Sequence, residues 1–258
     1  MKTMESPLLR YTGPDYTFID IRFEDDVDFK TDLQLNTLLL PVSEIEHWKY
    51  TCIGEVVGQP KRAIVVIGWK AGDEPESATR FRSAEFWSPL RPRLSSDVAI
   101  IHVAIRLDWP HLFSGRTDIT EIDFVRGPTE VMMGQDLADQ VDTLCWRTTA
   151  MSPHEDPTEL VGGQGSTAFD DGRGRSTVVL FFWWKSRMDR DIFIDPDQDS
   201  AGGPKEYAEL ITELFEEITA AGGSVEKLDI SCHMWYPEPT GSRKRAYSSL
   251  NKFCCAIQ

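Results

Sequence analysis

The sequence lacks any long apolar run. No stretch of about 18 consecutive apolar residues occurs, so no helix is predicted to cross a membrane. The first residues, Met1–Pro7, lack the apolar core of a secretory signal peptide. Cysteine is scarce as well: the chain has 5 cysteines, and this odd number predicts free thiols in a reducing compartment. Together these absences predict a soluble, cytoplasmic protein.

Positive charge is also in short supply. The chain has 27 Lys and Arg residues against 42 Asp and Glu residues, which gives a formal net charge of -15 at pH 7. Nucleic acid is therefore not an expected partner, because phosphate binding needs a basic surface.

Sequence signatures of metal sites and of nucleophilic catalysis are missing too. No Cys and His spacing suggests zinc, and no nucleophile elbow is present. Asp195–Asp199 imitates a calcium-binding loop together with Glu206. However, Ser200 replaces the glycine that such a loop requires, and Pro204 interrupts it. We therefore expect no metal site.

What the sequence does contain is one order of strands and helices, repeated. In the first half, strands are predicted at 16–23, 47–57, 62–70 and 98–107, with helices at 28–40 and 76–93. In the second half, strands are predicted at 117–125, 159–169, 177–185 and 225–236, with helices at 135–147 and 206–221. Each half has the β-α-β-β-α-β order of the ferredoxin-like motif.

Apolar periodicity carries these assignments. Residues 16–23 alternate, which places Ile19 and Ile21 on the same face of a strand. In the helix predicted at 28–40, Phe29 and Leu33 belong to the expected apolar side. The helix at 206–221 has the clearest apolar stripe, formed by Tyr207, Leu210, Ile211, Leu214, Phe215 and Ile218.

Three positions match between the two halves. The matched pairs are Asp20 and Asp123, Trp69 and Trp184, and His102 and His233. The spacing between partners grows where the second half has a loop insertion, which fits a duplication followed by loop growth. We therefore predict two ferredoxin-like units at 14–110 and 116–237, followed by a basic C-terminal tail at 238–258.

Four segments resemble the dimeric α+β barrel superfamily, which includes antibiotic-biosynthesis monooxygenase-like and stress-responsive A/B barrel domains. They are Cys52–Pro60, the strand end Gly68-Trp69, the helical segment Phe81–Trp87 and the strand containing His102-Val103. The resemblance is to fungal members with tandem repeats. The resemblance implies an α+β fold in which two tandem ferredoxin-like units form an intramolecular barrel. Such a pseudo-dimer would exist as a monomer or a homodimer.

The resemblance also implies a class of function. Proteins of this superfamily often act in polyketide or other specialised metabolism as cofactor-independent oxygenases, cyclases, dehydratases or decarboxylases. We therefore expect a cofactor-free enzyme that binds an aromatic or polyketide-derived small molecule and carries out monooxygenation, cyclisation or dehydration. The alternative is a non-catalytic small-molecule-binding or stress-response barrel. The superfamily has no universal catalytic motif, so no residue role carries over from it.

Two histidines in predicted strands are candidate catalytic residues. His102 and His233 could act as general bases near neutral pH, because an unperturbed histidine has a pKa of about 6.5. The alternative for both is a structural histidine that is hydrogen-bonded within the barrel. The first half is the preferred location of the site, because the second half has a glycine-rich strand and a long insertion.

Two aspartates lie inside apolar strands, where an unpaired carboxylate is costly. Asp20 is expected to pair with Arg22, and Asp123 with Arg126. This pairing would make both aspartates structural.

Candidate substrate-binding residues come from tryptophans and from arginines of the first half. The tryptophans could form the wall of an aromatic pocket, although strand aromatics are more often core residues. The arginines could orient an anionic or phenolate substrate, although solvated helix arginines are commoner. These candidates are Trp69, Trp87, Trp184, Trp235, Arg80 and Arg82.

The last four residues, Cys255 to Gln258, match a C-terminal prenylation box, with glutamine favouring a farnesyl group on Cys255. Cys254 could add a palmitoyl group, and Arg243–Arg245 supplies local positive charge. A prenylated tail would give weak membrane association, since one lipid chain alone binds membranes marginally. The alternative is a chance match, and the negative charge of the whole chain would oppose binding to an anionic membrane.

Overall fold

The computed structural model describes residues 15–70, 83–104, 119–134, 136–137, 139–141, 143, 162–166, 169–170, 174–184, 190 and 204–235. Within these ranges, none of the helices has both the length and the apolar character needed to cross a membrane. The candidates Arg80, Arg82 and Cys255, and the whole of the predicted tail, lie outside the described residues.

The fold is built on a nine-stranded antiparallel sheet in which each predicted strand has a counterpart. The strand order is β4-β1-β3-β2-β9-β5-β8-β6, and β7 also pairs with β8. The strands are β1 (Asp15–Arg22), β2 (Trp48–Val56), β3 (Arg62–Trp69), β4 (Ala99–Ala104), β5 (Ile119–Pro128), β6 (Gly162–Gly165), β7 (Phe169–Asp170), β8 (Arg175–Trp184) and β9 (Ser224–Trp235).

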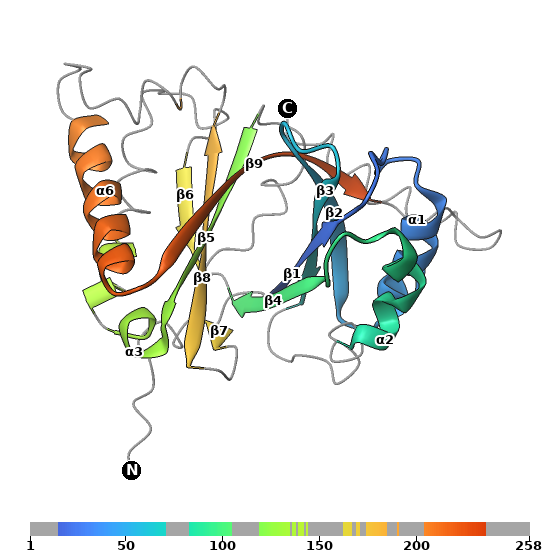
Figure 1. The fold of residues 1–258 in the computed structure, drawn as a ribbon, viewed down its shortest axis with the longest axis horizontal. Coiled ribbons are helices and arrows are strands. Elements are labelled where there is room, and N and C mark those ends of the chain that lie inside the picture. Colours follow the sequence, from blue (N-terminus) through green and yellow to red (C-terminus); the bar gives the residue numbers. More distant parts are fainter. Residues whose placement is uncertain are drawn as a thin grey trace, which may run out of the picture.

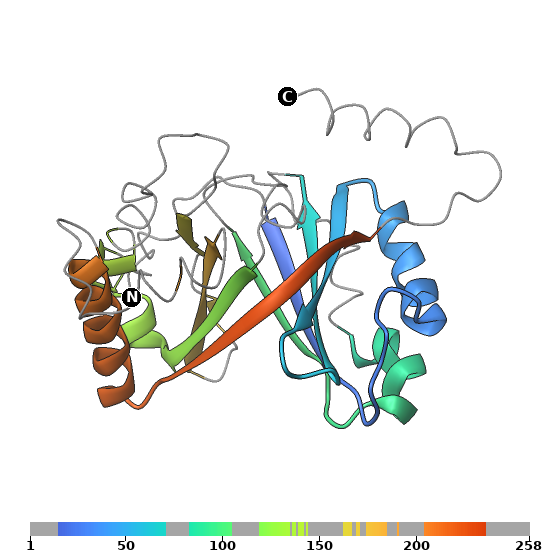
Figure 2. The ribbon, with the colours of Figure 1, turned by 90° about the horizontal axis from the view of Figure 1, so that it is seen from above.

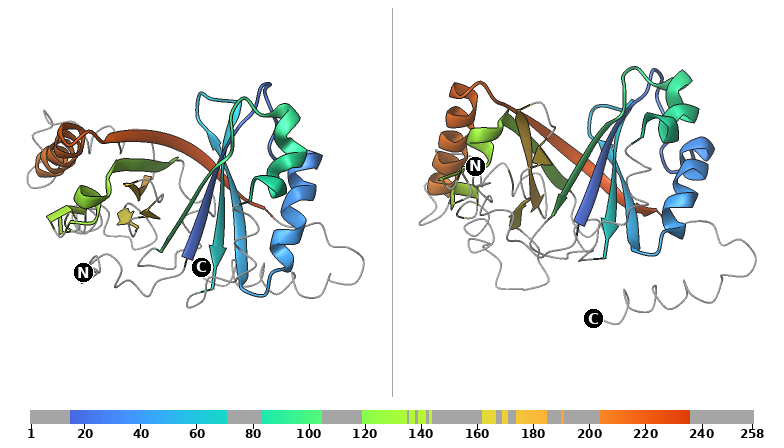
Figure 3. Two further views of the ribbon diagram at one scale, coloured as in Figure 1. Left: turned by 60° about the horizontal axis from the view of Figure 1, so that its bottom comes forward. Right: turned by 90° about the horizontal axis from the view of Figure 1, so that it is seen from below.

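The sheet bends so that its two halves face each other and nearly close into a barrel (Figure 1). Strand β9 runs across both halves and pairs with β2 on one side and β5 on the other (Figure 2). The helices lie on the outside of the barrel, as both views in Figure 3 show. They are α1 (Leu33–Leu39), α2 (Ala84–Trp87), α3 (Thr129–Met132), α6 (Pro204–Ala220) and the 3-10 helices η2 (Leu40–Glu44) and η4 (Ser88–Arg93).

The strand alternation divides the core into three layers. The barrel interior is filled by one face of the sheet, where the Phe18 ring lies 5.2 Å from that of Phe181 between ring centroids. On the other face, Ile19 and Ile21 pack beneath the helices of the first half, as the sequence pattern predicted. A third layer lies between the second half of the sheet and α6. Ligand-sized spaces are therefore expected on the helix-covered faces rather than inside the filled barrel.

Helix predictions were less accurate than strand predictions. Helix α1 begins only after Asp32, whose side chain accepts a hydrogen bond from the Leu35 amide. Leu33, which was predicted to face inward, is 79% exposed, while Leu35 and Leu39 are buried. Helix α6 agrees with its prediction, because Ile211, Leu214 and Ile218 are buried. The side chain of Tyr207 lies outside the described set.

An ionic network at the interior face joins the two halves of the sheet. Arg62 on β3 donates two hydrogen bonds to Asp20, at 2.8 and 2.9 Å, and its Nη1 lies 2.7 Å from Glu226 on β9. The predicted partner Arg22 also contacts Asp20, at 3.3 Å. Burial tends to raise the pKa of Glu226, but hydrogen bonds from Arg62 and Arg126 hold it below its usual value.

The strand pairing corrects two of the three matches proposed between the halves. Trp69 and Trp184 do occupy corresponding strand ends, on β3 and β8. Asp20 and Asp123 do not correspond, because Asp20 is paired with the interior residue Ile64, whereas Asp123 is paired with the helix-side residue Leu180. His102 and His233 do not occupy corresponding positions in the two halves either. The residue that does correspond to His102 is identified with the site below.

Candidate active sites on the helix-covered faces of the sheet

His102 lies on the helix-covered face of the edge strand β4. Its neighbours Ile101 and Val103 point into the barrel interior, so His102 points to the opposite side. The ring is half-buried, and its Nδ1 lies 2.9 Å from Thr17 Oγ1 on the paired strand β1. Trp69 on β3 donates its indole N–H to the same Thr17 oxygen, also at 2.9 Å. Side chains from three neighbouring strands, β3, β1 and β4, are therefore joined by two hydrogen bonds in series.

The chemistry of Thr17 suits a histidine that changes protonation state. The indole N–H of Trp69 can only donate, so Thr17 accepts from it with one lone pair. The hydroxyl keeps a second lone pair and one hydrogen, so it can either accept from or donate to Nδ1 of His102. If Nδ1 carries the hydrogen, the basic lone pair of the ring is on Nε2, and Thr17 can still accept a hydrogen bond from Nδ1 in the imidazolium that forms when Nε2 takes up a proton.

A cavity of about 670 Å³ borders this face of the first half. Ile100, which is two residues before His102 and on the same face of β4, forms part of its wall. Trp87 supplies an aromatic surface, and Arg91 and Asp97 supply charged groups. This volume lies within the range of small-molecule sites, about 300–1,000 Å³.

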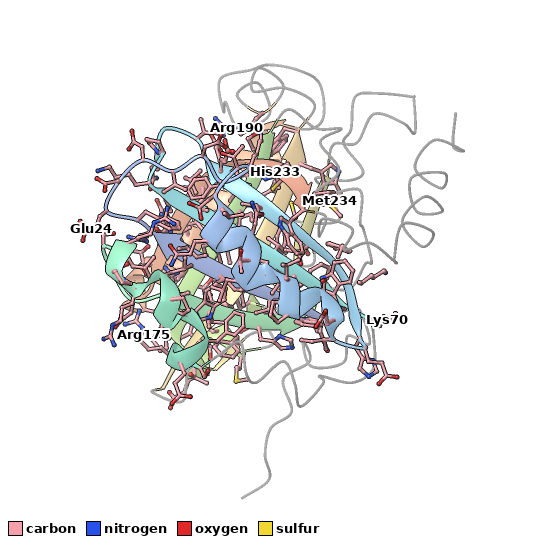
Figure 4. All side chains as sticks on the ribbon, turned by 90° about the vertical axis from the view of Figure 1, so that its right-hand side faces the viewer. Glu24, Lys70, Arg175, Arg190, His233 and Met234 are labelled. Atoms are coloured by element: carbon pink, nitrogen blue, oxygen red, sulfur yellow. The ribbon has the colours of Figure 1, made fainter. Side chains whose placement is uncertain are left out.

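His233 lies on the same helix-covered face but far from His102. It sits on β9 opposite Ile53 of β2, with β1, β3 and β2 between its strand and β4. At about 4.8 Å per strand, the two histidines are about 19 Å apart across the sheet. Figure 4 looks onto α1 and α2, with His233 labelled on β9 behind them.

The two ring nitrogens of His233 are buried and have no hydrogen-bond partner among the described residues. Burial, and then the positive charge of Lys30, lower the pKa of His233, while Glu55 and Asp28 act in the opposite direction. The ring is therefore neutral at pH 7. In contrast to His102, no described neighbour orients it.

Three of the four candidate tryptophans are core residues with a structural role for the indole N–H. Trp69 donates to Thr17, Trp184 donates to Glu121 at 3.2 Å, and Trp235 donates to Asn36 at 2.6 Å. All three are buried. Trp87 is the candidate whose side chain lines the large cavity of the first half. Trp87 is itself buried in the core of the first half, so a role as the wall of an aromatic pocket stays a prediction.

The second half repeats the arrangement around Trp69 with different side chains. Trp184 ends β8 as Trp69 ends β3. Its indole N–H donates to Glu121 on β5, the first strand of the second half. Thr17 is paired with His102 across β1 and β4, and Glu121 is paired with Asp229 across β5 and β9. The structural counterpart of His102 is therefore Asp229, four residues before His233.

Charged side chains surround Glu121. Arg190 forms an ion pair with Asp229 and lies 4.0 Å from Glu121, and Lys227 also lies 4.0 Å from Glu121. Burial raises the pKa of Glu121, and the charges of Lys227 and Arg190 oppose that rise. A cavity of about 330 Å³ borders the cluster.

Asp123 corrects a sequence-based expectation. Its predicted partner Arg126 instead donates to Glu226, at 2.9 Å. The Asp123 side chain is fully buried, and neither carboxyl oxygen has a hydrogen-bond partner among the described residues. Burial, followed by the negative charge of Glu121, raises the pKa of Asp123 well above its usual range.

Sequence reasoning missed most of the groups that surround these sites. The alternation that puts Ile19 and Ile21 on one face of β1 also puts Thr17 on that face, because Thr17 lies two residues before Ile19. The same pattern on β5 places Glu121 and Asp123 on one face, a pair of acids in a buried strand. No sequence signal indicates the contributions of Arg190 and Asp229, because they depend on cross-strand pairing. In the described part of the chain, no three His, Cys, Asp or Glu side chains converge as metal ligands would.

No protein-family model and no curated protein matches this chain. Among solved structures, an anthrone oxidase-like protein matches with a TM-score of 0.57 at 12% identity, over 88% of this chain and 94% of that chain. A candidate monooxygenase from Fusobacterium nucleatum subsp. nucleatum ATCC 25586 has a TM-score of 0.52 at 10% identity, over 87% and 94%. Another, from Lactobacillus acidophilus NCFM, has a TM-score of 0.50 at 8% identity, over 86% and 95%. These likenesses confirm the predicted α+β barrel fold.

Proposed function

We propose that the chain is an enzyme of small-molecule metabolism that uses His102 as a proton acceptor on an aromatic or polyketide-derived substrate. The observation that carries this proposal is the hydrogen-bond series from Trp69 through Thr17 to His102, which orients a half-buried imidazole. His102 does not line the 670 Å³ cavity itself, but Ile100, two residues earlier on the same face of β4, does. The reaction would be a monooxygenation, cyclisation or dehydration that needs no cofactor.

The structural neighbours support the same class of function. One is anthrone oxidase-like and two are candidate monooxygenases. Anthrone oxidation is chemistry that a positioned base can start. His102 would remove a proton from the methylene carbon between the aromatic rings, and the electron pair would move onto the carbonyl oxygen. The resulting anion would reduce dioxygen, so that one anthrone and one dioxygen give one anthraquinone and one water.

The order of strands supports a tandem origin for this barrel. The first half reads β4-β1-β3-β2 and the second reads β9-β5-β8-β6, with helices α1 and α2 in the first half and α3 and α6 in the second. We propose that units 14–110 and 116–237 arose by duplication, with fungal tandem-repeat barrels as relatives. The fused pair would exist as a monomer or a homodimer, with membrane association only if Cys255 is prenylated.

The second candidate function is small-molecule binding without catalysis. The observation that favours it is the burial of Trp69, Trp184 and Trp235, because these tryptophans serve the core rather than a substrate. In that case His102 is a structural histidine held by Thr17, and a ligand in the cavity would be bound and released without chemical change.

A substitution experiment separates the two functions. Anthrone turnover is followed by dioxygen uptake and by the absorbance of the quinone, for the wild type, His102→Ala and His233→Ala. Loss of a general base lowers turnover by about 10²- to 10⁴-fold, so we expect that loss in His102→Ala with anthraquinone binding retained. His233→Ala should remain near the wild-type rate.

Two outcomes would overturn the proposal. Loss of turnover in His233→Ala with full activity in His102→Ala would move the site to β9. If neither substitution changes the rate, or if the wild type oxidises neither anthrone nor related phenols, the non-catalytic function takes its place. Tryptophan fluorescence, which reports binding, shows in each case whether the ligand still enters.

A further inference from the structure

We propose that the second half carries a separate ligand site, built on Asp123 and Glu121, for a small phenol or enol. The site is the counterpart of the His102 site, because Glu121 takes the place of Thr17 beside an equivalent tryptophan. It is independent of the proposed function, since it lies in the other half of the sheet and shares no residue with the first site.

Five acidic or basic side chains make up the site, and they come from three parts of the chain. Glu121 and Asp123 lie on β5, Lys227 and Asp229 lie on β9, and Arg190 lies between β8 and α6. Alternation places the strand residues on the face opposite Ile122 and Phe124, which fill the barrel interior. The cluster therefore faces the helix layer, not the barrel core.

Glu121 has the surroundings of an ionised carboxylate that can accept a hydrogen bond. It receives the Trp184 N–H at 3.2 Å and has Arg190 and Lys227 at 4.0 Å. Its side chain lines the 330 Å³ cavity with Arg190, Lys227 and Asp229, and Val57 and Leu228 add apolar wall.

Asp123, in contrast to Glu121, has no described hydrogen-bond donor at its carboxyl group. It is paired with Lys227 on β9, but the Lys227 ammonium lies 4.6 Å from the centre of the Phe215 ring, and no described group hydrogen-bonds to either Asp123 oxygen. Leaving a buried polar group without a partner is unfavourable, so the Asp123 carboxyl has hydrogen-bonding capacity that the described residues leave unused and that a ligand could use. Asp123 does not itself line the cavity, but it lies two residues along β5 from Glu121, which does, and on the same face of the strand.

The two carboxyl groups define the ligand chemistry. Residues two apart on a strand are separated by about 6.6 Å, which leaves room for a hydroxyl group between them. Glu121 accepts a hydrogen bond from that hydroxyl, and Asp123, kept protonated by its apolar surroundings, donates one to the same oxygen. Because Glu121 and Asp229 balance Arg190 and Lys227, the cluster carries no net charge when Asp123 is protonated. A neutral phenol or enol fits better than a strong anion.

The test uses resorcinol, a single-ring diphenol, as the probe. Nuclear magnetic resonance of ¹⁵N-labelled protein follows the indole N–H signal of Trp184, which Trp184→Phe assigns. We expect resorcinol to shift this signal in the wild type and in His102→Ala. In Asp123→Leu the affinity should fall by about tenfold or more, because one hydrogen bond to the ligand is lost.

The outcomes separate this site from the first one. The proposal is overturned if the Trp184 signal does not respond to resorcinol in the wild type, or if Asp123→Leu binds it as tightly as the wild type does. If Asp123→Leu does not fold, Asp123→Ala takes its place, because it also removes the donor, and unchanged affinity in that variant overturns the proposal. Failure here leaves the turnover result for His102 unaffected, and loss of turnover in His102→Ala leaves this binding unaffected.

Discussion

The two halves of the sheet hold the same backbone arrangement and different chemistry. In the first half, Trp69 donates to Thr17 and Thr17 is hydrogen-bonded to His102. In the second half, Trp184 donates to Glu121, which lies opposite Asp229. The pairing of three neighbouring strands fixes where these side chains meet, and the side chains decide what the site can do. The two proposed sites are thus built on a histidine in the first half and on carboxyl groups in the second.

The surroundings of each site match its charge. The Thr17 and Trp69 side chains are neutral, so the hydrogen-bonded chain they form with His102 needs no charged partner. Glu121 is buried, so its ionised form requires the nearby charges of Arg190 and Lys227. Asp123 is the exception within the second half, because no described residue satisfies its carboxyl group. This contrast is the observation that supports the ligand site proposed for the second half.

The largest expected effect comes from copying Asp123 into the first half. Ile19 holds the corresponding place, since it lies two residues beyond Thr17 and is fully buried beneath the helices. Ile19→Asp should lower the free energy of unfolding by about 4 kcal/mol or more, from lost apolar burial and an unpartnered carboxyl. Urea denaturation measures it, and Ile19→Val, expected to cost about 0.5–1.5 kcal/mol, is the control. Similar losses in both variants would show that the first half tolerates a buried acid.

The opposite exchange, Asp123→Leu, should raise the free energy of unfolding by about 1–3 kcal/mol, because it removes an unpartnered buried group. The gain should depend on pH. Below the usual carboxyl pKa of about 4, Asp123 is protonated in both the folded and the unfolded chain. Above it, only the unfolded chain loses the proton until the raised folded pKa is reached. The wild type therefore loses stability relative to Asp123→Leu as pH rises, by up to about 1.4 kcal/mol per pH unit.

Urea denaturation of both proteins at pH 4 and at pH 7 checks this dependence. A gain that is equal at the two pH values would mean that the pKa of Asp123 is not raised. A loss of stability in Asp123→Leu at both values would mean that the carboxyl has a partner in solution.

The smallest effect is expected at Thr17. Thr17→Val removes the hydroxyl that holds His102, and a single neutral hydrogen bond is worth about 0.5–1.5 kcal/mol, so anthrone turnover should fall by up to about tenfold. Thr17→Ser keeps the hydroxyl and should restore the rate. Steady-state kinetics should show the loss in kcat rather than in KM, because the hydroxyl orients the base and does not touch the substrate. An equal loss in the valine and serine variants would argue against a positioning role.

Much of the fold could be predicted from the sequence, for a physical reason. A strand with one face in the barrel and the other beneath helices alternates between two buried layers, and the pattern of β1 around Ile19 and Ile21 showed this directly. Short helices are harder to predict: α1 begins at the Asp32 cap, and the second predicted helix becomes 3-10 helix around Pro89 and Pro92.

The site could be predicted only in part. His102 and Trp69 were recognised because their residue types stand out in apolar strands. The expected pairing of Asp123 with Arg126 was wrong, because Arg126 belongs to the opposite face of β5 and is bound to Glu226. The match of His102 with His233 was wrong for a similar reason. Strand register is set by tertiary pairing, and a shift of a few residues changes every cross-strand neighbour.

The most direct test of the central claim is a crystal structure with anthraquinone bound. The account predicts the ligand on the helix-covered face of the first half, with its rings beside Trp87 and an oxygen within hydrogen-bond reach of His102. Anthraquinone bound inside the barrel against Phe18 and Phe181, or on the far side of the sheet beside His233, would contradict it.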